Sequence, residues 1–219
     1  MDTTRWRLPA LLLKAVLAAL LVLALAFPDW DRFADKAMGA RAIGYPLAVL
    51  LLPVLWTAFR RRGVPWDIDL LITAPFVIDV AGNALDLYDT VDRFDDACHF
   101  GNWFLLAAAA GVAVRRWGRL PSWAVALSCA GIGAITAILW ELAEYQLFIL
   151  DTPETVTIYR DTIGDLMLGL LGSAAAGALT AVATRRGGRT RPVRPDVLVA
   201  GAGAAGAGAA RAEPVGAGQ

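Results

Sequence analysis

Six long apolar segments constrain the fold of this chain more than any other feature of its sequence. Apart from the longer fifth, they hold about 17 to 25 mostly apolar residues each, and about 20 residues of α-helix cross a hydrocarbon core of roughly 30 Å. A backbone in lipid must satisfy its own hydrogen bonds, so we expect all six to be helices. The hydrophobic fraction of 58% also exceeds that of ordinary soluble domains. The segments are approximately Leu8–Phe27, Ile43–Phe59, Leu70–Leu87, Ala97–Val114, Ser122–Leu150 and Thr162–Ala183.

Basic residues flank alternate ends of these segments and predict the topology. Fifteen of the 20 Lys and Arg residues fall on the side of the two chain ends, which the positive-inside rule assigns to the cytoplasm. The sequence therefore predicts an all-α, polytopic membrane bundle of about six spans, with both ends in the cytoplasm. The basic residues on the opposite side are Arg32, Lys36, Arg41, Arg93 and Arg160.

The first segment leaves an alternative open. Ala24-Leu25-Ala26 resembles a signal-peptidase site after an apolar run, and cleavage there would leave five helices and an external N-terminus. The fifth segment is longer than one crossing. We expect its last turns, from about Glu141, to lie at or beyond the membrane boundary, unless the helix tilts.

The chain divides into a transmembrane domain, residues 1–186, and a tail, residues 187–219, rich in Gly, Ala, Pro and Arg. This composition predicts a disordered cytoplasmic tail. Its Gly201, Gly203 and Gly206 match a dinucleotide fingerprint, but the 13 residues after Gly206 are too few for the helix and strand of a βαβ site. The net charge of zero gives no indication of a nucleic-acid partner.

Polar residues inside the segments are the candidate functional residues, because ionisable groups cost several kcal/mol in lipid and face protein or water. Asp79, Asn83 and Asp86 of the third segment are spaced four and three apart, which places them on one helix face. Asp79 is expected near the middle of the membrane. Desolvation there should raise its pKa unless a cation or donor compensates.

Four helices offer carboxylates at the same end of the predicted bundle. Together these carboxylates would surround His99, which is the only histidine in the chain. So many carboxylates cannot all stay ionised and dry, and protonation, arginine pairing or divalent cations are the three ways to relieve the repulsion. The candidates are Asp79, Asp86, Asp95, Glu141, Glu144, Asp161 and Asp165.

Carboxylates and a histidine on facing helices are a recurring metal site in helix bundles. We expect His99, Glu141, Glu144, Asp161 and Asp165 to hold a divalent cation, for which Zn, Mg and Mn all suit the ligands. Asp95 would orient His99 or act as a base, so Asp95 and His99 are the candidate catalytic residues. The zinc motif H-E-x-x-H, the G-x-S-x-G elbow and a C-x-x-C pair are absent from the sequence.

Three sequence blocks resemble the YjdF-like family of bacterial inner-membrane proteins, a domain family of unknown function. They are Tyr88-Asp89 followed by Asp95-x-x-x-His99-Phe100, then Trp140-Glu141-Leu142-x-Glu144-Tyr145, then Asp161-Thr162-x-x-Asp165. The resemblance covers residues 76–183 and implies a helical membrane fold with this polar cluster. A longer stretch before His99 leaves open whether Asp89 or Asp95 holds the matching carboxylate.

The sequence leaves three functions open and does not decide whether the chain is an enzyme. The first is a metal-dependent hydrolase of lipid or envelope precursors, whose substrate would be linked to lipid. The second is a proton- or ion-coupled transporter using Asp79 and Asp165, and the third is a non-enzymatic assembly subunit. In each case we expect a multi-pass protein of a bacterial plasma membrane, with the lipid bilayer as its surroundings and an oligomeric state that the sequence does not indicate.

Overall fold

The computed structural model describes residues 3–34, 36–61, 63–118, 120–146, 150 and 158–187. These residues form helices and turns, and no strand. Two short elements, η1 (Thr4–Trp6) and α4 (Leu87–Thr90), accompany six long helices. The long helices are α1 (Arg7–Ala26), α2 (Met38–Ala58), α3 (Trp66–Ala84), α5 (Phe94–Trp117), α6 (Ser122–Glu144) and α7 (Ile158–Gly187).

Each predicted apolar segment corresponds to one long helix, and the predicted fold class is confirmed. Five of the helices are long and apolar enough to cross a membrane. The sixth, α3, carries three acidic residues within its 19 residues, Asp67, Asp69 and Asp79, and is not one of these five. The chain is therefore a multi-pass helical membrane protein, while the number of spans and their orientation stay predictions.

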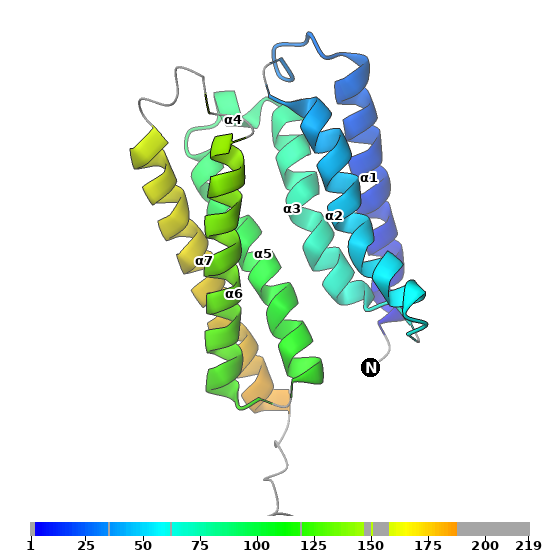
Figure 1. Ribbon diagram of the computed structural model, residues 1–219, viewed down its shortest axis with the longest axis vertical. Helices are drawn as coiled ribbons and strands as arrows, with labels where there is room; N and C mark the ends of the chain where they lie inside the picture. Colours follow the sequence, from blue (N-terminus) through cyan, green and yellow to red (C-terminus); the bar gives the residue numbers. More distant parts are fainter. Residues whose placement is uncertain are drawn as a thin grey trace, which may run out of the picture.

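The six long helices form two groups of three (Figure 1). Helices α1, α2 and α3 contact one another, and so do α5, α6 and α7. Between the groups, α3 packs against α5, whereas α2 and α6 do not contact each other along their described backbones. The two groups therefore meet along one line of packing, and the side between α2 and α6 is not closed by a helix pair.

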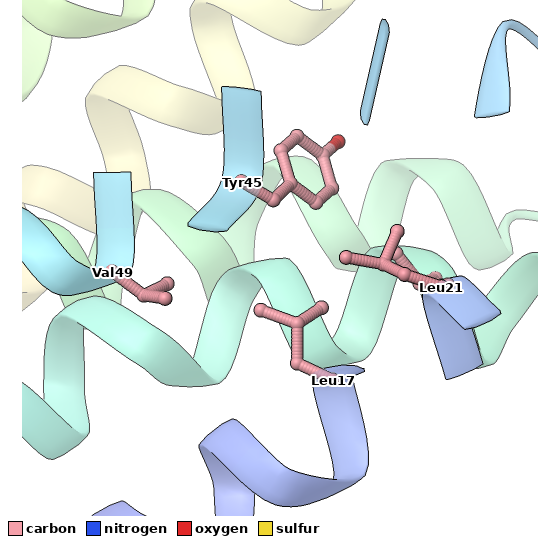
Figure 2. Packing of buried hydrophobic residues seen from close by; sticks show 5 residues of the cluster. Leu17, Leu21, Tyr45 and Val49 are labelled. Carbon is pink, nitrogen blue, oxygen red and sulfur yellow. The ribbon is translucent and has the colours of Figure 1, made fainter. Parts of the chain in front are cut away.

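The first group has an apolar core of its own. Leu17 and Leu21 of α1, Tyr45 and Val49 of α2, and Val80 of α3 form a buried cluster, shown in Figure 2. Trp140 of α6 is partly buried against this cluster. A side chain of the second group thus reaches the core of the first, although the backbones of α2 and α6 remain apart.

Glycines allow the helices of the second group to approach closely. A side chain at Gly172 of α7 would meet the carbonyl oxygen of Phe100 on α5, and one at Gly133 of α6 would meet Ser173 on α7. Gly169 and Gly177 lie in similarly close contacts, as the sequence predicts for small residues at membrane helix interfaces. Gly164 differs, because a side chain there would meet nothing within 4 Å.

The start of α1 and the end of α7 lie at the same end of the bundle, and α4 lies at the other (Figure 1). This arrangement fits a chain whose two ends share one side of a membrane. The tail, residues 188–219, lies outside the described residues, so its disorder stays a prediction. Cys98 on α5 and Cys129 on α6 are free and buried.

Candidate functional site

A cavity of about 460 Å³ lies between the two helix groups, toward the α4 end. Its walls come from α2, α3 and α4 on one side and from α5, α6 and α7 on the other. The lining includes six carboxylates, which are Asp79, Asp95, Glu141, Glu144, Asp161 and Asp165. Two cationic side chains, Lys36 and Arg41, also line it.

His99 lies at the centre of the wall formed by α5, α6 and α7. Its Nε2 is 3.7 Å from Oδ1 of Asp95, one turn earlier on α5, and 3.6 Å from Oδ1 of Asp165 on α7. Asp165 is buried, whereas the Asp95 side chain is 50% exposed. These three residues form one group whose ligand atoms all lie within 4.8 Å of one another.

The other ring nitrogen of His99 faces a different helix. Nδ1 is 3.7 Å from Oε1 of Glu141 on α6, and Glu144 lies one turn further along that helix. His99, Glu141 and Glu144 form the second group that could hold a cation. The structure thus divides the expected ligands between the two nitrogens of one imidazole, and one ion cannot bind both.

The distances between His99 and its carboxylates exceed those of hydrogen bonds. A hydrogen bond from an imidazole nitrogen to a carboxylate is about 2.9 Å long, well below the 3.6 to 3.7 Å found here. Two ligands of a tetrahedral ion with bonds of about 2.1 Å lie roughly 3.4 Å apart. Small side-chain adjustments would therefore bring either group into coordination distance.

Three buried polar atoms of this wall have no hydrogen-bond partner within the described part of the chain. They are Nδ1 of His99, Oδ1 of Asn102 and Oε1 of Glu141. Leaving such an atom unsatisfied costs about 1 to 3 kcal/mol, and more for a charged group. All three residues line the cavity, so a cation or donor bound there would relieve this cost.

The opposite wall is organised around Asp79. Its carboxylate accepts hydrogen bonds from Nε of Arg41 at 2.8 Å, from the Tyr45 hydroxyl at 2.6 Å and from the Tyr88 hydroxyl at 3.3 Å. The side-chain amide of Asn83 donates to the Asp79 carbonyl oxygen at 3.0 Å. Arg41 therefore supplies the compensating cation that a buried Asp79 requires.

Tyr88 contributes to this wall from α4, outside the spans. Burial raises the pKa of the Tyr88 phenol far above its usual value of 10.0, so its hydroxyl keeps its proton at neutral pH. The Asp79 carboxylate thus receives a neutral donor from Tyr88 as well as the charge of Arg41.

The structure separates two expected residues from the His99 groups. Helix α3 ends at Ala84, and Asp86 follows in a left-handed conformation with φ of 60°, so Asp86 does not share a helix face with Asp79 and Asn83. The expectation of one continuous face was wrong there, because the spacing rule holds only within a helix. Asp161 lines the cavity but is exposed and belongs to neither group around His99.

Asp89 and Asp95 have different surroundings in the structure. Asp89 is exposed and pairs with Lys36 at 2.9 Å, whereas Asp95 lies beside His99. Asp95 is thus the carboxylate of that stretch that the fold places at the histidine.

Several cavity residues were not expected from the sequence. Arg41, Tyr45, Trp103 and Trp140 line it together with the expected carboxylates. Arg41 and Tyr45 are spaced four apart at the start of an apolar helix, and this spacing could have marked a polar face. The sequence gives no signal that their partner is Asp79, because that pairing depends on how α2 packs against α3.

A second buried ion pair lies toward the other end of the bundle. Nζ of Lys14 on α1 is 2.6 Å from Oδ2 of Asp69 and 2.8 Å from the Thr73 hydroxyl, both on α3. Asp69 is only 1% exposed. Lys14, expected as a flanking charge that sets topology, is instead part of the packing between α1 and α3.

The chain matches one known protein family along most of its length. A family model described as a predicted membrane protein, DUF2238, matches residues 9–186. The chain belongs to the DUF2238 family. The match spans all six long helices and every residue of the His99 groups, and it confirms the resemblance to the YjdF-like family of unknown function.

The other comparisons add no relative. Neither the curated proteins nor the solved structures contain a match to this DUF2238 chain. Its function must therefore be inferred from its own residues.

Proposed function

We propose that this protein is a metal-dependent hydrolase that acts on lipid-linked substrates at the α4 end of the bundle. The observation that carries the proposal is the group of Asp95, His99 and Asp165, whose ligand atoms lie within 4.8 Å of one another in the wall of a cavity. Catalytic zinc sites commonly use three protein ligands and leave a further position to water. Two carboxylates and one imidazole suit Zn or Mn, and Mg where more water is retained.

The roles of the residues follow from their positions. Asp95, Asp165 and Nε2 of His99 would hold the ion, and Glu141 would accept the Nδ1–H of His99 and so fix the orientation of the ring. A bound divalent ion would supply a water of lowered pKa. Compared with the expectation from sequence, Asp95 becomes a ligand and Glu141 takes the orienting role.

Asp161 is the candidate general base. It lies at the exposed edge of the cavity, and its charge interacts with those of Asp95 and Asp165. Asp161 would accept a proton from the attacking water while the water oxygen forms a bond to the electrophilic atom of the ester. The ester bond then breaks, and the leaving alcohol takes that proton from Asp161, so water is the only co-reactant.

The surroundings of Asp79 argue against the alternative of a proton- or ion-coupled transporter. A coupling site near the membrane middle must exchange its proton or ion, but Asp79 is held by Arg41 and two tyrosine hydroxyls. Releasing Asp79 from these partners would leave a charge buried, which costs several kcal/mol.

Metal analysis of the purified protein tests the proposal. Protein purified without chelators should contain close to one divalent ion per chain, and His99→Ala and Asp165→Asn should lose it. Asp92→Asn, an exposed position that does not line the cavity, is the matched control and should retain it. Ester hydrolysis of membrane lipids by the loaded protein should stop on chelation and in the two metal-free variants. Stable protein that contains no metal would overturn the proposal.

A further inference from the structure

The cavity has two zones of different polarity. The carboxylates, His99 and Arg41 lie near the α4 end, and apolar side chains lie one to two helical turns deeper. On α5, for example, His99 is followed by Trp103 and Leu106, and on α3 Pro75 and Phe76 precede Asp79. This arrangement fits an amphiphile, with its polar headgroup among the charges and the start of its apolar chain against the deeper wall.

In the described residues, no contact between helices closes the side of the cavity between α2 and α6. Both helices contribute lining residues, but their backbones do not contact each other in the described residues. Trp140 of α6 packs against the apolar cluster to which Tyr45 and Val49 of α2 belong. Large apolar side chains on both helices are exposed, including Leu47 of α2 and Leu142 of α6, so lipid is the natural surrounding of this side.

The charge of the cavity indicates the headgroup. With His99 neutral, the lining holds six carboxyl groups and two cationic side chains. Full ionisation of the carboxyl groups would leave an excess of four negative charges, which protonation or a divalent ion would reduce. Arg41 already pairs with Asp79, and Lys36 pairs with Asp89. An anionic headgroup would add to the remaining negative charge of the cavity, whereas a cationic group would reduce that charge.

Aromatic side chains lie among these charges. Tyr45, Tyr88, Trp103 and Trp140 all line the cavity. Faces of Trp and Tyr rings attract ammonium groups, most strongly where water is excluded. Oδ1 of Asn102, which has no hydrogen-bond partner among the described residues, would also find a donor in a primary ammonium.

We propose that the substrate is a membrane lipid whose headgroup carries an ammonium group, and that it enters the cavity from the bilayer between α2 and α6. This inference names the substrate class of the hydrolase and so rests on the proposed function. A zwitterionic aminophospholipid fits best, because its phosphate can approach the ion while its ammonium group pairs with carboxylates such as Glu144. Glu144 lies outside the Asp95, His99 and Asp165 group.

The test uses the full chain in detergent, with lipids added one at a time and binding followed by native mass spectrometry. Phosphatidylethanolamine should bind about tenfold more tightly than its N-acetylated form or phosphatidylglycerol, since one charge-assisted contact of about 1.4 kcal/mol corresponds to a factor of ten. Glu144→Gln should abolish this preference, and Asp92→Asn should preserve it. Equal binding of the three lipids, or an unchanged preference in Glu144→Gln, overturns the inference.

Two further measurements separate the possible outcomes. Soluble glycerophosphoethanolamine should bind far more weakly than the intact lipid, and equal binding would overturn entry from the membrane. Metal content is measured on the same samples. Bound metal without lipid preference would contradict this inference alone, whereas lipid preference in a metal-free protein would contradict the hydrolase and leave ammonium recognition standing.

Discussion

Nε of Arg41 lies 2.8 Å from Oδ2 of Asp79, and this ion pair connects α2 to α3 at the wall of the cavity. The two side chains are only 12% and 16% exposed. The pair neutralises the α3 carboxylate that faces the cavity, and the hydroxyl groups of Tyr45 and Tyr88 donate hydrogen bonds to the same carboxylate. The Asp79 carboxylate is therefore well supplied with hydrogen bonds, whereas the His99 wall holds three buried polar atoms without a partner in the described part of the chain.

Arg41→Met should destabilise the protein by roughly 3 kcal/mol, because it leaves the Asp79 charge buried without its cation. Thermal unfolding in detergent, followed by circular dichroism, measures the loss. Adding Asp79→Asn to Arg41→Met should recover part of the stability. Lys36→Met is the control, since the exposed pair with Asp89 should contribute less than about 1 kcal/mol. Equal losses in Arg41→Met and Lys36→Met would contradict the structural role of Arg41.

Gly172→Ala should separate α5 from α7. The added methyl group would meet the backbone carbonyl oxygen of Phe100, which cannot rotate away as a side chain could. We expect a loss of about 1 to 3 kcal/mol, typical of overpacking. Gly164→Ala on the same helix places its methyl group in open space and should cost nothing measurable. If both variants unfold at the temperature of the parent protein, the close packing of α5 and α7 is wrong.

The helices could be predicted because each is specified by its own residues. Apolar length alone identified all six, and the structure differs mainly at their ends. Helix α2 begins at Met38, before the first continuous apolar residues. Helix α6 is assigned as far as Glu144, and residues 147–149 of the predicted segment lie outside the described residues. Such boundaries depend on turns and on packing partners, which an apolar run does not contain.

The site was predictable as a set of residues but not as a set of contacts. Spacing on each helix brought Asp95 and His99 to one face, and the shared bundle end suggested Glu141 and Asp165. The ring nitrogen that each carboxylate faces depends on helix rotation, which one sequence does not reveal. The partners of Asp79 and Asp69, namely Arg41 and Lys14, lie on other helices and were missed for the same reason.

Substituting the carboxylates that face the two ring nitrogens of His99 should show which nitrogen binds the ion. If the ion binds Nε2, Asp165→Asn removes a ligand, whereas Glu141→Gln removes only the group that orients the ring. We expect Glu141→Gln to weaken metal affinity about 10- to 100-fold and Asp165→Asn to weaken it more. Competition with a chromophoric chelator measures the metal affinity of each variant. Affinity should also fall on acidification, since the ligands must lose their protons to bind. The reverse order of the two variants would place the ion on the Nδ1 side.

Reporter fusions test the orientation of the bundle. The basic residues predict a cytoplasmic end for α7, so a reporter active only in the cytoplasm should work after Gly187 and fail after Asp151. The opposite pattern would move the His99 cavity to the cytoplasmic side. Thiol labelling is a weaker test here, because Cys98 and Cys129 are both buried.

Helix α1 should remain in the mature protein, and the Lys14–Asp69 pair gives the physical reason. Cleavage after Ala26 would remove Lys14 and leave the Asp69 carboxylate, 1% exposed, without its cation. It would also remove Leu17 and Leu21 from the apolar core. The intact mass of the purified protein should therefore correspond to a chain that includes residues 1–26, and a mass that begins after Ala26 would contradict this.

Lys14→Met should lower the free energy of unfolding by roughly 3 to 5 kcal/mol, as measured by thermal unfolding. Lys14→Met combined with Asp69→Asn should lower it clearly less, because the second change removes the carboxylate charge that has lost its cation.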